Sequence, residues 1–137
     1  MAYSIDPLTA DCYPGTAVLI NKLGIRNDSE LAEAEAEIVS VRIAEWSRVP
    51  LVATFDFEHY KAVHRYLFGD LYDWAGQVRT VNLAKKGTLF CSAEKIEDRG
   101  RLIFDRLQRL NYLKGMKHGD FVEELTDFYC STNELHP

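Results

Sequence analysis

Largely apolar positions recur every three or four residues in four stretches of the chain, the spacing that places them on one face of an α-helix. The four series are Leu31, Ala34, Ile38 and Val41; Phe57, Tyr60, Val63, Leu67 and Leu71; Ile96, Gly100, Ile103, Leu107 and Leu110; and Phe121, Leu125, Phe128, Thr132 and Leu135. Asn27 followed by Glu30 has the capping-box pattern ahead of a helix over 28–47. Asp56 is suited to cap the second helix.

The last two helices have their own start and stop signals. Ser92 is expected to cap the third helix, which ends before Gly115. Asp120 with Glu123 is expected to cap the fourth.

On the fourth helix we expect the series from Phe121 to Leu135 to form the buried stripe. Tyr129, Asn133 and His136 fall on a neighbouring face. His136 is therefore not an obvious core residue.

Between the second and third helices the pattern changes to alternation. Residues 80–83 alternate, Lys85-Lys86-Gly87 supplies a turn, and Thr88-Leu89-Phe90 returns as a second short strand. We predict a β-hairpin over 79–90. Because an exposed strand edge can accept a peptide strand, this hairpin is a candidate docking edge.

The composition is that of one ordinary globular domain. The chain has 137 residues, of which 47% are hydrophobic and 27% charged. Its formal net charge is −5, and it has no run of Lys or Arg, so nucleic acid is not an expected partner.

The three cysteines and the chain start point to a reducing compartment. Cys12, Cys91 and Cys130 are widely spaced and form no Cys-x-x-Cys pair, which indicates neither a disulfide framework nor a zinc site. The first twelve residues have no signal-peptide pattern, and no apolar run is long enough to span a membrane. We expect a cytoplasmic protein that makes no membrane contact.

The histidines do not have the spacing of a metal site. His59 and His64 are five residues apart and so miss the i, i+4 geometry of a helical zinc pair. No serine-hydrolase elbow, P-loop or dinucleotide-binding motif occurs either. The Tyr72-Asp73-Trp74-Ala75-Gly76 segment is interpreted as a packed corner with Trp74 buried.

One long segment closely resembles the region before the flap of Fic domains: it runs from His64-Arg65-Tyr66-Leu67-Phe68-Gly69-Asp70-Leu71 through Tyr72-Asp73-Trp74-Ala75-Gly76 to Gln77-Val78-Arg79-Thr80-Val81. The segment from Tyr13-Pro14-Gly15-Thr16 to Ile25 is similar to the start of many Fic proteins. Asn133-Glu134-Leu135-His136-Pro137 resembles the run into the family motif His-Pro-Phe-x-Asp/Glu-Gly-Asn-Gly-Arg, of which the first two residues are present.

The resemblance implies a mainly α-helical fold, the Fic helical bundle with one short β-hairpin called the flap. It also implies that residues 1–137 form the N-terminal portion of a single Fic domain whose C-terminal part is missing. We expect the parent protein to be the enzyme and the truncated chain to be inactive.

The activity implied is AMPylation, the transfer of AMP from Mg-ATP to a Ser, Thr or Tyr hydroxyl of a target protein. His136 is then the catalytic base, because an imidazole can accept the hydroxyl proton near neutral pH. By the same analogy Lys86, Gly87 and Asn133 join His136 in nucleotide binding. Asn82, Leu83, Leu89 and Phe90 are the expected flap residues for target docking. No metal ligand is assigned, since the ligands for ATP and Mg²⁺ lie largely in the missing segment.

Two alternatives to the AMPylation hypothesis stay open. One is a non-catalytic interaction module that uses the flap edge. The other is a Fic enzyme with a different phosphate-containing donor. An inhibitory glutamate would come from a helix of the Ser29–Glu33 type, from the missing part, or from an antitoxin-like partner.

Overall fold

The computed structural model describes residues 11–48, 53–80, 82, 84–85 and 88–137. The elements in chain order are α1 (Asp28–Ala44), η1 (Trp46–Arg48), α2 (Phe57–Phe68), β1 (Ala84–Lys85), β2 (Thr88–Leu89), η2 (Ala93–Lys95), α3 (Ile96–Arg109), η3 (Asn111–Leu113) and α4 (His118–Leu135), where η denotes a 3₁₀-helix. The chain is mainly helical, as the sequence predicts.

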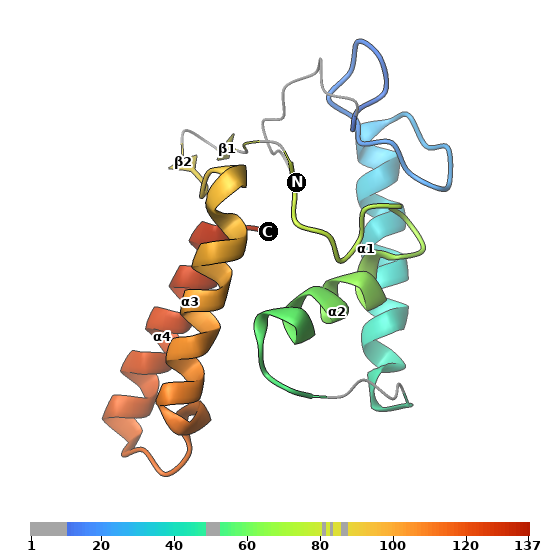
Figure 1. Ribbon diagram of the computed structural model, residues 1–137. Coiled ribbons are helices and arrows are strands. Elements are labelled where there is room, and N and C mark those ends of the chain that lie inside the picture. The colour runs from blue at the N-terminus through green and yellow to red at the C-terminus, as the bar shows by residue number, and fades with distance from the viewer. Residues whose placement is uncertain (1–10, 49–52, 81, 83, 86–87) are drawn as a thin grey trace.

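The helices are arranged as two pairs (Figure 1). α1 packs against α2, and α3 turns back through η3 into α4 to form an antiparallel helical hairpin. α2 also contacts α3 and so links the two pairs. None of the helices in the described ranges is long and apolar enough to cross a membrane.

The first core joins α1 to the segments on either side of the first helix pair. Leu71 and Tyr72, which directly follow α2, are 0% and 3% exposed and pack on Leu31 of α1. The backbone N–H of Lys22 donates to the Leu71 carbonyl at 2.7 Å, which ties the N-terminal loop to this corner. Leu71 belongs to the apolar series predicted for the second helix, yet it lies in the turn after the helix ends.

The second core joins α2, α3 and α4. Its buried members are Phe57, Ile96, Phe104 and Leu135. Gly100 allows the close approach of α3 to α2, because a Cβ atom there would lie 2.6 Å from the Phe57 ring. The glycine in the predicted helical series therefore has a packing role.

The helix starts confirm two of the predicted caps. The Asn27 side chain accepts hydrogen bonds from the backbone N–H groups of Ser29 and Glu30 at 3.0 and 3.1 Å. Asp56 accepts from the His59 N–H at 2.8 Å. Both side chains satisfy donors that have no partner within the helix.

The other two predicted caps are wrong. Ser92 precedes η2 and makes no side-chain capping bond, while α3 itself begins at Ile96. α4 begins at His118, so Asp120 lies in the first turn. A carboxylate is favourable there because it faces the positive end of the helix dipole, which gives the same sequence signal as a cap.

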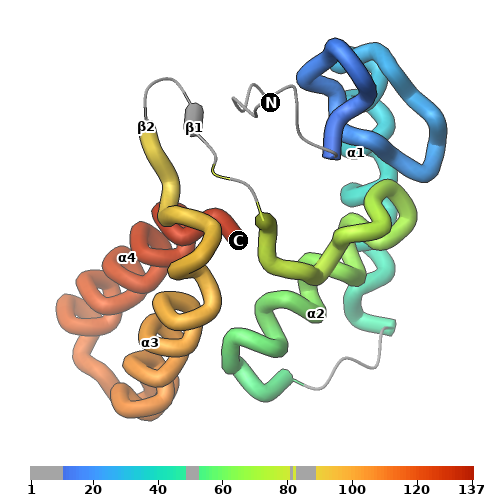
Figure 2. The backbone as a smooth tube through the Cα atoms, turned by 45° about the horizontal axis from the view of Figure 1, so that its top comes forward, coloured from blue at the N-terminus to red at the C-terminus, as the bar shows by residue number. Residues whose placement is uncertain are grey.

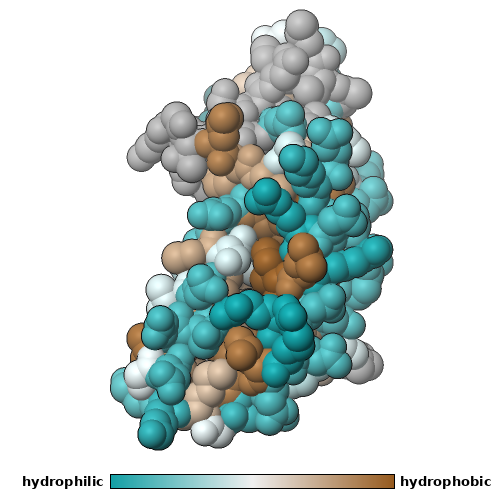
Figure 3. Space-filling model, turned by 60° about the vertical axis from the view of Figure 1, so that its left-hand side comes forward, coloured by the Kyte–Doolittle hydropathy of each residue, from teal (hydrophilic) through white to brown (hydrophobic). Residues whose placement is uncertain are grey.

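The predicted buried stripe of α4 is correct only in its second half. Thr132 and Leu135 are buried, but Phe121 and Leu125 are 38% and 45% exposed. The second core gathers at the C-terminal half of α4, and the other half extends past it. The face formed by α3 and α4 consequently shows apolar patches among hydrophilic side chains (Figure 3).

Two short antiparallel strands lie before α3. Ala84 pairs with Leu89 and Lys85 with Thr88. The first strand was expected at residues 80–83, but its described residues Thr80 and Asn82 are not in a strand. Alternation alone does not fix where pairing begins, because register also depends on turn geometry.

We expect Gly100→Ala to destabilise the protein by about 1–3 kcal/mol, because the added methyl group overlaps the buried Phe57 ring. Gly119→Ala is the matched control, since Gly119 is also helical and a methyl group added there would meet no atom within 4 Å outside its own stretch of helix. That change should be neutral or stabilising by up to about 1 kcal/mol. Urea unfolding of both variants measures the difference, and equal stabilities would mean that the ring moves aside freely.

Candidate functional site

The last helix ends at a histidine in an unusual backbone conformation. His136 follows the final residue of α4 with φ 40° and ψ 66°, the left-handed region, and its N–H donates to the Thr132 carbonyl at 3.1 Å. A residue with a side chain is strained there by about 1–2 kcal/mol relative to glycine. The surrounding contacts must offset this strain.

Arg79 supplies many of those contacts. Its Nε donates to the His136 carbonyl at 2.7 Å and its Nη2 to the Leu135 carbonyl at 3.2 Å, and Nη2 also donates to the Cys91 carbonyl. The Arg79 backbone N–H donates to the Pro137 carbonyl at 3.1 Å. Figure 2 shows the chain end beside the segment that leads to β1.

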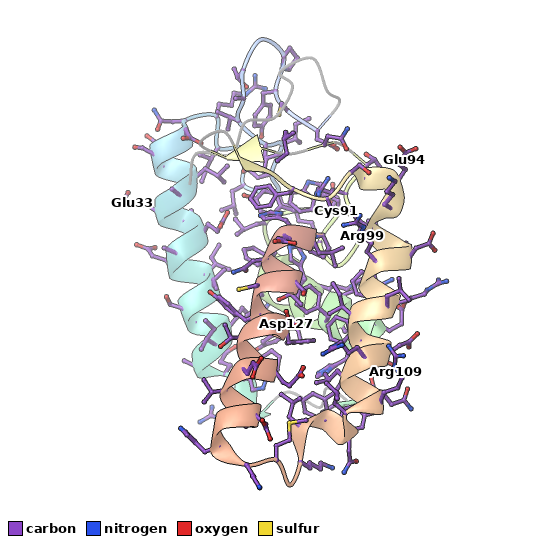
Figure 4. All side chains as sticks on the ribbon, turned by 90° about the vertical axis from the view of Figure 1, so that its left-hand side faces the viewer. Glu33, Cys91, Glu94, Arg99, Arg109 and Asp127 are labelled. Atoms are coloured by element: carbon purple, nitrogen blue, oxygen red, sulfur yellow. The ribbon has the colours of Figure 1, made fainter. Side chains whose placement is uncertain are left out.

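The residues after β2 lie against the same helix end. The Phe90 and His136 ring centroids are 4.6 Å apart. The Cys91 backbone N–H donates to the Glu134 carbonyl at 2.9 Å, and Figure 4 shows Cys91 beside the end of α4. The hairpin and the histidine are thus joined by backbone and ring contacts.

A second imidazole lies near the first. His64 of α2 is half-buried, and its Nδ1 accepts the Gly76 N–H at 3.0 Å, which places the proton of the neutral ring on Nε2. Burial lowers the pKa of His64, and the positive charge of protonated His136 lowers it further. The two rings are therefore close enough for their charges to repel.

The Trp74 corner scaffolds this region. Trp74 is half-buried rather than buried, and its ring stacks on Tyr72 at 4.5 Å and lies 6.1 Å from His64. The Tyr72 hydroxyl donates to Glu35 at 2.8 Å, and burial with the Glu35 charge raises the pKa of Tyr72. The corner connects α1 to the neighbourhood of His64.

The other predicted site residues that the structure describes have differing surroundings. Asn133 is exposed on the last turn of α4, and Leu89 is 82% exposed on β2. Asn82 accepts the Ala93 N–H at 2.8 Å through its side chain and thereby holds the start of η2. Leu83, Lys86 and Gly87 lie outside the described residues.

Two cavities lie among the described residues. A cavity of about 420 Å³ lies between α2 and α3 and is lined by residues such as Lys61, Arg65 and Glu97. A second of about 140 Å³ lies around Phe55 and Tyr112. Neither includes His136, and in the described part of the chain no three His, Cys, Asp or Glu side chains cluster as metal ligands.

Sequence reasoning gave neither Arg79 nor His64 a role in the site. A lone arginine at the start of a predicted strand carries no signal that it reaches carbonyls 56 and 57 residues away. A lone histidine on a helix is equally uninformative without its neighbours. Both roles depend on long-range contacts.

The site is a helix-terminal histidine held beside a short hairpin in a mainly helical domain. Known proteins resemble the chain in sequence and in overall fold. Over 91% of its length the chain is 41% identical to a Salmonella typhimurium protein named "Probable protein adenylyltransferase Fic". The N-terminal Fic domain of a Bartonella effector protein from Bartonella sp. AR 15-3 superposes with a TM-score of 0.84 at 30% identity, over 93% of this chain and 63% of that one. A BepC protein of Bartonella tribocorum with bound AMPPNP gives a TM-score of 0.81 at 26% identity, over 93% of this chain and 68% of that one. No family model matches the chain.

The chain belongs to the Fic domain family. It spans 62% of the length of the Salmonella relative.

We expect His64 to make the protein less stable as the pH falls below the ordinary histidine pKa of 6.5. The unfolded chain then binds a proton at His64 that the folded chain resists, so stability is lost as the pH falls from 6.5 toward the lower folded-state pKa. Unfolding free energies at pH 7.5 and 5.5 should therefore converge in His64→Gln. His118→Gln, at the exposed start of α4, is the control and should retain the wild-type difference. An unchanged pH dependence in His64→Gln would contradict the assignment.

Proposed function

We propose that the parent protein transfers AMP from ATP to a hydroxyl group of a target protein, with His136 as the general base. The observation that carries this proposal is the place of His136 at the end of α4, against Phe90 of the hairpin segment, in a chain whose relatives are named adenylyltransferases. The bound AMPPNP in the BepC neighbour supports a nucleotide donor.

The chemistry suits an imidazole. A hydroxyl is a weak nucleophile at neutral pH, and His136 accepts its proton while the oxygen forms a bond to the α-phosphorus. The bond from that phosphorus to the bridging oxygen breaks, and pyrophosphate leaves. His136 is half-buried, so its ring is still accessible to a substrate.

We place most of the phosphate and Mg²⁺ ligands in the part of the parent protein beyond the length matched here. The developing charge on the phosphate needs several donors and a cation. Among the described residues no cluster of metal-binding side chains was found. Asn133 is an exposed polar residue three positions before His136. We retain Asn133, Lys86 and Gly87 as proposed nucleotide contacts.

We propose that β2 is the edge that docks the target. Leu89 is 82% exposed, so its apolar side chain is open to contact with a partner. A target segment that adds to this strand places its own hydroxyl next to Phe90 and hence next to His136. The same exposed edge also suits the interaction-module alternative, so the decisive test concerns catalysis.

We propose that inhibition comes from a segment or partner other than α1. Glu33, the glutamate of the Ser29–Glu33 pattern, is exposed. Figure 4 shows it on the outer side of α1, away from Cys91 and the end of α4. This position favours an antitoxin-like partner or another part of the parent protein.

We expect His136→Ala in the parent protein to reduce AMP transfer by at least about 100-fold, the usual contribution of a positioned base. ATP binding should stay within a few-fold of wild type. Incorporation of label from α-labelled ATP, with binding measured by calorimetry, tests both statements. His118→Ala is the matched control and should leave both unchanged.

The position of the label separates the open alternatives. Incorporation from γ-labelled ATP alone would replace AMP transfer by phosphorylation. Absence of incorporation with retained partner capture would favour the interaction module. Joint loss of transfer and ATP binding in His136→Ala would argue against the base role.

We expect Leu89→Asp to raise the KM for the target protein by about 10-fold or more, because a charge replaces an apolar contact in the docking edge. The KM for ATP should not change. Leu102→Asp is the control, since Leu102 is 64% exposed on α3, outside the proposed docking edge. Steady-state kinetics with both substrates varied decides between docking and a general loss of folding.

A further inference from the structure

Four consecutive carbonyls end α4 and its extension, and two distant residues cap all of them. Cys91 donates its N–H to Glu134, and Arg79 donates to Leu135, His136 and Pro137. The last carbonyls of a helix have no donors within the helix, so partners of this kind are needed. Cys91 meets that need for Glu134 and Arg79 for Leu135, and Arg79 also bonds the two carbonyls that follow the helix.

The hydrogen bonds from Arg79 stabilise a turn that usually contains glycine. Helices that end in the left-handed conformation commonly place glycine at that position, because glycine adopts a positive φ without strain. Here the position is His136, with φ 40°. Something other than backbone preference must hold the turn, and the guanidinium is bonded to the carbonyl of the strained residue itself, at 2.7 Å.

We propose that Arg79 is the positioning residue for His136, which it fixes in the left-handed turn that aims the imidazole at the hairpin. This proposal rests on the proposed base role of His136. Arg79 does not need to touch substrate, because it acts through the backbone of residues 135–137.

The same guanidinium also sets the hairpin relative to the base. Its Nη2 bonds the Cys91 carbonyl as well as the Leu135 carbonyl. Cys91 directly follows Phe90, whose ring contacts the His136 ring. One side chain therefore fixes the docking edge relative to the base, and the loss of the Arg79 guanidinium should disturb both together.

The charge of Arg79 fits this role. The guanidinium is partly buried and stays protonated at any physiological pH. It lies at the C-terminal, negative end of the α4 dipole, where a cation is stabilised. Its planar array of donors can bond several carbonyls at once, which a lysine ammonium on a flexible stem does less well.

The test uses the protein as its gene encodes it and observes the His136 ring directly by NMR. The Phe90 ring should shift the Cε1–H resonance of His136, which the variant His136→Gln assigns. In Arg79→Met and Arg79→Lys this resonance should move toward the value of a free histidine. The kcat for AMP transfer should fall by about 100-fold in Arg79→Met, with the KM for ATP within about two-fold. Arg42→Met, which removes an arginine bonded to Asp70 between α1 and α2, should leave the resonance and kcat unchanged.

Each outcome bears on one proposal. If the His136 resonance of a folded Arg79 variant stays at its wild-type position, the positioning role is overturned, even if transfer by wild type is normal. A wild type that transfers no AMP overturns the proposed function, and the resonance still decides the role of Arg79. Should both Arg79 variants fail to fold, the wild-type Arg79 Nε–H decides: slow exchange with solvent is expected of a donor to His136, and exchange as fast as a free guanidinium overturns the proposal.

Discussion

The functional end of this molecule depends on the hydrogen bonding of the last carbonyls of α4. A helix end exposes acceptors that its own backbone cannot satisfy. Here the donors come from Arg79 and Cys91, which precede and follow the hairpin. Closing the helix therefore also closes a loop that contains β1 and β2. The hydrogen bonds that satisfy these carbonyls thus place the hairpin beside the end of α4, with Phe90 against His136.

The two helix pairs bring this end to the rest of the domain. α2 contributes Phe57 to the core with α3 and α4, and the turn after it contributes Leu71 to the core with α1. The close approach of α3 to α2 depends on Gly100, which leaves room for the Phe57 ring. The corner after α2 then leads directly to Arg79. The packing of α2 in this way controls the starting point of the segment that caps α4.

Local sequence patterns predicted those features of the fold that depend on interactions between residues close in sequence. The second helical series as far as Leu67 and the caps at Asn27 and Asp56 were correct, because helical period and side-chain capping act within a few residues. The starts of α3 and α4 were misplaced, since Ser92 precedes the short η2 helix rather than α3, and Asp120 lies in the first turn of α4 rather than at its cap. The burial of Phe121 and Leu125 was also wrong, because an apolar face does not reveal how far its partner helix extends. For the site, the resemblance proposes His136, whereas the contacts of Arg79 and His64 are long-range and appear only in the fold.

The left-handed conformation of His136 affects which residues selection accepts at this position. Glycine adopts such a backbone without strain, so a chain with glycine there keeps its fold and gives up only the imidazole. Selection for expression or solubility alone would accept that exchange and even favour it. Under the proposed base role, His136 serves chemistry and not backbone preference, and variant libraries ranked by folding yield alone would accumulate inactive members.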